Sequence, residues 1–169
     1  DRWSARVIGG LADAVGGRAL FPFGGPPWWP FQRWAMRAEP VAPSPLGLLI
    51  HPEAGLWHAY RGAVALADDV GEIVAPTPVE PPCASCAGRP CLTRCPVDAF
   101  DETGYDVVRC VAHVESPLGA LCRTDGCRAR DACPVARGRR YAEEEIRFLM
   151  RAFLTARRAA RGSASKDSR

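Results

Sequence analysis

The chain has 169 residues, 47% of them hydrophobic, which is enough for one domain of ordinary size with a buried core. Its formal net charge of +3 is uneven, because residues 1–82 carry −2, residues 83–136 carry −1 and residues 137–169 carry +6. No apolar run approaches the roughly 18 residues that a membrane-spanning helix needs, so we expect no membrane contact. The first residues also lack the order of a signal peptide, although a start at Asp1 leaves room for a preceding segment.

The first 82 residues are expected to form a helical and hairpin segment. Apolar residues at helical spacing predict a helix over residues 4–16, with Ser4 as its N-cap. A turn-rich stretch follows, and Pro30 suits the first position of a short helix over residues 30–38. The tryptophans around this helix are interpreted as packing residues, with a docking surface or cofactor wall as the alternative.

Two apolar runs, residues 46–50 and 56–66, are predicted to pair as a β-hairpin around the turn at residues 51–55, with the start of a helix as the alternative for the second run. His51 and His58 flank this turn and are interpreted as structural histidines. The proline-rich stretch at residues 75–82 predicts a connector and the boundary of this segment.

Helical turns are predicted over residues 92–100 and 107–114, with Asp106 as the N-cap of the second. The strongest helical pattern covers residues 141–160, where an apolar stripe predicts an amphipathic C-terminal helix. The last residues, 162–169, are small and polar and are expected to form a flexible tail.

The eight cysteines all lie between Cys83 and Cys133. A secreted disulfide scaffold would be expected to staple the whole of a small chain, so this distribution indicates an inorganic centre in a reducing compartment. Cys110 stands alone between two groups. These groups read Cys83-x2-Cys86-x4-Cys91-x3-Cys95-Pro96 and Cys122-x4-Cys127-x5-Cys133-Pro134.

Both groups end in a Cys-Pro pair, and this ending predicts how the thiolates are shared. Bacterial two-cluster ferredoxins place three closely spaced cysteines on one cluster, whereas the fourth, which precedes a proline, binds the other cluster. A crossed division between two [4Fe–4S] clusters uses every cysteine once. Cluster 1 would be held by Cys83, Cys86, Cys91 and Cys133, and cluster 2 by Cys95, Cys110, Cys122 and Cys127.

Other metal states remain open at this point: one cluster with a degenerate second site, structural zinc, or disulfides. Zinc sites usually use two paired Cys or His knuckles, and only Cys83 and Cys86 form a clean one here. His113 has no second histidine at a matching spacing. Iron and zinc share thiolate ligands, so metal content or the visible spectrum distinguishes them.

Three stretches resemble the C-terminal half of the epoxyqueuosine reductases, which are iron–sulfur and corrinoid enzymes of tRNA modification. The stretches are LGLLIHPEAGLWHAYRGAVAL (46–66), CASCAGRPCLTRCPVDAF (83–100) and RCVAHVES (109–116). The resemblance implies a tight His-Pro-Glu-x-Gly turn ahead of a ferredoxin-like module with two [4Fe–4S] clusters, and the same crossed division of the cysteines. Residues 1–45 are too short for the corrinoid-binding half of that family, and no counterpart of its catalytic acid is found.

The sequence therefore predicts an α+β protein with a dicluster ferredoxin-like module over residues 83–136. An N-terminal segment (1–82), a C-terminal amphipathic helix (137–161) and a tail (162–169) would flank this module. The expected function is cytoplasmic electron transfer between a reductase and an unidentified acceptor, with a redox protein as partner and no catalytic residue. Alternatives are a corrinoid-dependent reductase or a zinc module. Nucleic-acid binding is not expected, because the basic C-terminal end has few aromatic side chains available for base stacking.

Overall fold

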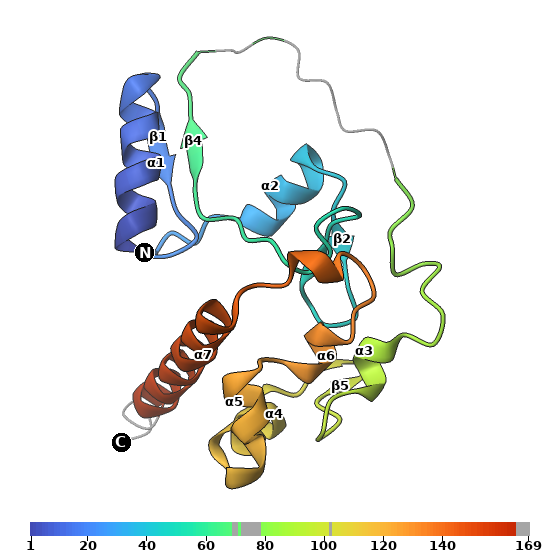
Figure 1. Cartoon of the computed structure of the whole chain (residues 1–169). Coiled ribbons are helices and arrows are strands. Elements are labelled where there is room, and N and C mark those ends of the chain that lie inside the picture. Colours follow the sequence, from blue (N-terminus) through green and yellow to red (C-terminus); the bar gives the residue numbers. More distant parts are fainter. Residues whose placement is uncertain (69–70, 72–78, 102, 165–169) are drawn as a thin grey trace. The chain divides into compact units, whose positions relative to one another are not determined.

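Figure 1 shows the computed structural model of the chain, which describes residues 1–68, 71, 79–101 and 103–164. Helices and short two-stranded sheets are mixed, as expected of an α+β protein. The chain divides into two compact units. Unit 1 comprises Asp1–Ala42 and His58–Val79, and unit 2 comprises Pro43–Trp57 and Glu80–Arg169. None of the helices in the described residues is both long enough and apolar enough to cross a membrane.

Unit 1 consists of helices and one antiparallel strand pair. Its elements are α1 (Arg2–Ala14), β1 (Arg18–Leu20), α2 (Phe31–Ala38) and β4 (Ala63–Ala65). Helix α1 packs on β1 and β4, which pair with Leu20 opposite Ala63. The predicted cap is wrong: α1 begins after Asp1, whereas Ser4 is buried inside the helix and accepts a hydrogen bond from Nε of Arg61 at 3.3 Å.

Unit 2 contains short strands, short helices and one long C-terminal helix. Its strands are β3 (Leu49–Ile50), β5 (Phe100–Asp101) and β6 (Gly104–Tyr105), and β2 (Ala42–Pro43) leads into it. Its α-helices are α3 (Pro90–Thr93), α4 (Val107–Glu115), α5 (Ala120–Thr124), α6 (Arg128–Asp131) and α7 (Glu143–Ala164). Two 3₁₀ turns are η1 (Pro117–Gly119) and η2 (Arg137–Arg139).

The predicted hairpin between residues 46–50 and 56–66 does not form. Strand β3 pairs with β2, and β4 pairs with β1. The turn at residues 51–55 closes on itself, because His51 and Gly55 exchange backbone hydrogen bonds of 2.8 and 2.9 Å. The two apolar runs therefore do not pair beyond this single bridge, and the chain passes from unit 2 to unit 1 after Trp57.

The helical turn predicted over residues 92–100 is also wrong in its extent. Helix α3 covers only Pro90–Thr93, and Phe100 already begins β5. The reason is local: a proline disfavours helical backbone in the residue before it, and Pro96 follows Cys95. Asp98 then adopts a φ of +47°, which no continuing helix allows.

The predictions for the later helices agree better with the structure. Asp106 is the N-cap of α4, and its Oδ1 accepts a hydrogen bond from the backbone N–H of Arg109 at 2.9 Å. Helix α7 begins at Glu143 and runs through Ala164, so it includes part of the predicted tail. Residues 75–78 of the predicted connector and 165–169 of the tail lie outside the described residues.

Cysteines belong to or border the core of unit 2. One buried cluster combines Leu46, Ile50 and Leu56 with Phe100 and Cys133, and five more cysteines border it. A second cluster joins α4 to α7 through Val111, Val114, Cys122 and Leu154. The carboxylate of Glu115 also binds Arg158 and Arg161, which fastens the end of α4 to α7.

Candidate metal centres

Four cysteines from distant parts of unit 2 line one narrow cavity. This set, which we name the Cys83 quartet, consists of Cys83, Cys86, Cys91 and Cys133. The rest of the wall is mainly apolar and includes Leu46, Ile50 and Leu56. The cavity itself is small, with a volume of about 20 Å³.

The other four cysteines line a second small cavity, of about 30 Å³. This Cys95 quartet consists of Cys95, Cys110, Cys122 and Cys127. Apolar side chains such as Phe100, Val114 and Met150 complete the wall, together with His113 of α4. The eight thiols thus divide four and four, and each quartet takes one member from the other sequence group.

Two short helices bring about this exchange. Helix α3 carries Cys91 and ends before Cys95, so the two thiols face different cavities. Helix α6 lies between Cys127 and Cys133 in the chain, and these two thiols also face different cavities. The two helices pack against each other and lie side by side in Figure 1.

The turn at residues 51–55 supports the first cavity from outside. Gly55 adopts a φ of +59°, and a Cβ atom there would lie 2.5 Å from the carbonyl oxygen of Val135. Only glycine permits both this backbone and this approach. Nδ1 of His51 accepts the N–H groups of Glu53 and Ala54, so this histidine orders the turn, as expected from the sequence.

Burial and mutual repulsion disfavour the charged form of these thiols. Burial, followed by the neighbouring Cys133 and Cys91, raises the pKa of Cys83 above its ordinary value. Burial is likewise the largest cause that raises the pKa of Cys127, to about 11. The thiols would need a cationic group between them to remain together as thiolates.

One hydrogen-bond donor points at a sulfur atom of the Cys95 quartet, since the backbone N–H of Ala99 donates to Sγ of Cys95 at 3.3 Å. Burial raises the pKa of Cys110, Cys122 and Cys127, while the neighbouring phenol of Tyr105 and backbone N–H groups of α6 act in the opposite direction. Such donors stabilise electron-rich sulfur, as is usual around iron–sulfur clusters.

The spacing of the thiols can be compared with what each metal group requires. Four thiolates on one zinc ion lie about 3.8 Å apart, since Zn–S bonds of about 2.3 Å form a tetrahedron. A cubane separates its ligands more widely, because each thiolate binds a different iron. In the part of the chain that the structure describes, no group of three or more His, Cys, Asp or Glu side chains is arranged to hold a metal ion. The donor set of each quartet, four thiols, is one that both zinc and iron–sulfur clusters use.

Two features of unit 2 near the cysteines were not singled out from the sequence. Tyr105 follows a turn and has no motif, so its position beside Cys110 could not be foreseen. Arg94 directly precedes Cys95, and Arg128 directly follows Cys127. Arginine is so common in this chain that its place next to a cysteine does not by itself predict a function.

Of the tryptophans interpreted as packing residues, Trp28 is 71% exposed, whereas Trp34 packs on Phe31 with ring centroids 5.2 Å apart.

The chain was compared with protein-family models, with curated proteins and with solved structures, and nothing matches it in any of the three.

Proposed function

We propose that the protein is an electron carrier that holds two [4Fe–4S] clusters in a ferredoxin-like arrangement. The observation that carries this proposal is the division of all eight cysteines between two cavities, with one member of each quartet exchanged. When bound, such clusters take up and release single electrons. The chain supplies thiolate ligands, apolar walls that limit solvent, and N–H and O–H donors that stabilise the added negative charge.

The packing of two helices supports transfer between the two cavities. Helices α3 and α6 pack together and carry or flank cysteines of both quartets. Electrons would therefore pass between the clusters through this helix pair. The proposed partners are a reductase and an acceptor in a reducing compartment, where thiols persist.

Iron analysis tests the proposal directly. Anaerobic reconstitution with iron and sulfide should give a brown protein with about eight irons per chain, and reduction should produce an electron paramagnetic resonance signal of [4Fe–4S] clusters. A colourless protein that binds one or two zinc ions would refute the proposal and favour the zinc module.

Double substitutions test the crossed division, with the same number of cysteines removed in each variant. C83A/C133A should retain about four irons, because both cysteines belong to one quartet. C83A/C95A should retain almost none, because each substitution damages a different cluster. The reverse pattern would show that each sequence group holds its own cluster.

A further inference from the structure

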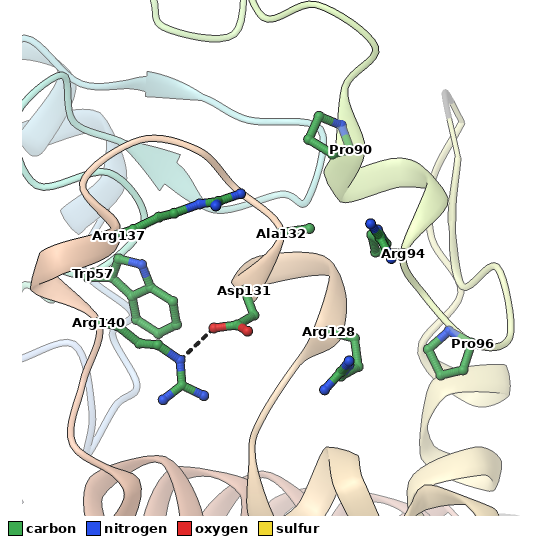
Figure 2. A pocket seen from close by; sticks show the side chains of 9 residues that line it. All are labelled: Trp57, Pro90, Arg94, Pro96, Arg128, Asp131, Ala132, Arg137 and Arg140. Carbon is green, nitrogen blue, oxygen red and sulfur yellow. Dashed lines mark hydrogen bonds and ion pairs between the residues drawn. The ribbon is translucent and has the colours of Figure 1, made fainter.

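A third cavity of unit 2, the arginine pocket, has no role in the proposed clusters. It has a volume of about 640 Å³ and is shown in Figure 2. Its polar wall consists of Arg94, Arg128, Arg137, Arg140 and Asp131, and Trp57 forms an apolar side. The arginines come from separate places in the chain: the end of α3, the start of α6, η2 and the residue after η2.

The positive charge of this pocket is largely unneutralised. Asp131 is the one carboxylate in the wall, and Arg140 already binds it (Figure 2). Among the residues that the structure describes, neither Arg94 nor Arg128 forms an ion pair. Nε of Arg137 reaches only the carbonyl oxygen of Cys133, at 3.5 Å. Three guanidinium groups around one cavity repel each other unless an anion lies between them.

Guanidinium groups are particularly suited to phosphate. Each presents a planar set of N–H donors that matches two phosphate oxygens at once, and these bonds are charge-assisted. The geometry therefore favours an anion with several acceptor oxygens over a simple halide.

Trp57 is held firmly at the side of the pocket. The residue is 8% exposed, and its ring packs edge-on against Tyr141, with centroids 5.4 Å apart. The guanidinium of Arg130 lies 4.3 Å from the centroid of the Trp57 ring and donates to the carbonyl of Leu56. The pocket thus has a preformed apolar wall beside its cationic groups, as small-molecule sites usually do.

We infer that the arginine pocket binds a small organic phosphate of nucleotide size, with its phosphates on Arg94, Arg128 and Arg137 and its organic part toward Trp57. The volume lies within the range of about 300–1,000 Å³ found for small-molecule sites. Because Arg94 precedes Cys95 and Ala132 precedes Cys133, the ligand would lie beside both quartets. An exchange of electrons between this ligand and the clusters would depend on the proposed function. The binding of the ligand to the pocket does not depend on it.

Calorimetric titration with ADP tests the inference, with adenosine as the phosphate-free comparison. ADP should bind with a dissociation constant that rises steeply with salt, whereas adenosine should bind at least tenfold more weakly. Equal binding of both compounds, or no binding of ADP, would overturn the inference. Binding of a single-stranded oligonucleotide without binding of ADP would also overturn it, in favour of a nucleic-acid surface.

Substitutions locate the binding. R94Q and R128Q should each weaken ADP binding about tenfold or more, because each removes charge-assisted hydrogen bonds. R151Q is the matched control, since it removes the same charge from an exposed position of α7 outside the pocket wall. An equal effect of R151Q would contradict the assignment.

Iron content is measured for each variant, because Arg94 and Arg128 adjoin cysteines. If R94Q or R128Q lowers the iron content, ADP binding is measured in R137Q instead, because Arg137 lies four residues from Cys133. Loss of ADP binding in R137Q supports the pocket, and unchanged binding refutes it. Failure of the proposed clusters would appear in the iron analysis of the unaltered protein and not in its ADP titration.

Discussion

The phenol of Tyr105 neighbours the thiol of Cys110, one member of the Cys95 quartet. Its ring is stacked on Phe100, with centroids 4.5 Å apart and planes 9° apart, which fixes the direction of the phenol. Burial, followed by the neighbouring thiol of Cys110, raises the pKa of Tyr105 above its ordinary value. The phenol therefore remains a donor throughout the physiological pH range.

This contact predicts a change in reduction potential. A donor to a ligating sulfur stabilises the reduced, more negative cluster, so Tyr105→Phe should lower the potential of the cluster in the Cys95 quartet. The expected shift is on the order of tens of millivolts, since about 59 mV corresponds to a tenfold change for one electron. A redox titration followed by electron paramagnetic resonance measures it.

Tyr141→Phe is the control for this substitution, because its ring packs on Trp57 instead of on a sulfur ligand. It should leave both potentials unchanged. An identical potential in Tyr105→Phe and the unaltered protein would show that the phenol does not act on the cluster.

At the scale of elements, the predicted grouping of the cysteines rests on short-range signals, whereas the predicted pairing of the strands, which is wrong, needed long-range ones. The grouping depends on local geometry, because Pro96 ends the helical turn after Cys91 and directs Cys95 elsewhere. The spatial division into quartets follows this pattern, while the role of the thiols as ligands stays a prediction.

The failed hairpin shows what the sequence could not determine. The apolar run near Val64 pairs with β1, which lies more than forty residues away in the chain. Gly17 and Gly62 allow this approach, because a Cβ atom at Gly17 would lie 2.6 Å from the side chain of Val64. Such a long-range choice depends on tertiary packing, which propensity and turn signals do not contain.

The turn at residues 51–55 predicts a measurable link between stability and the first cavity. Gly55→Ala would place a methyl group against Val135, two residues after Cys133, in backbone of positive φ. The backbone penalty is about 1–2 kcal/mol, and overpacking adds about 1–3 kcal/mol. Denaturant unfolding should show this loss, and iron analysis should show reduced occupancy of the Cys83 quartet.

Gly47→Ala separates the backbone penalty from the effect of overpacking. Gly47 also has a positive φ, of +71°, but a Cβ atom there meets nothing within 4 Å. This variant should lose only the backbone part of the stability and keep its iron. Equal losses in both variants would mean that the contact with Val135 is unimportant.

At the scale of the whole molecule, the two units differ in what holds them together. Unit 1 contains no cysteine, and its helix α1 packs directly on β1 and β4. The buried clusters of unit 2 include Cys122 and Cys133, and further thiols border both clusters. Without a cationic group, burial and the neighbouring thiols disfavour the charged form of these cysteines, so only neutral thiols can lie together there.

The stability of unit 2 should therefore depend on metal, whereas that of unit 1 should not. When binding organises a site that the unfolded chain lacks, the binding free energy contributes to folding. After oxidative removal of iron and chelation, amides of α4, α5 and α6 should lose most of their protection from hydrogen exchange, while those of α1 and β4 should keep it. Reconstitution with iron and sulfide should restore the lost protection, which controls for damage during removal. Protection that persists throughout unit 2 without metal would show that its core folds on apolar packing alone, and the cysteine quartets would then lose their structural role.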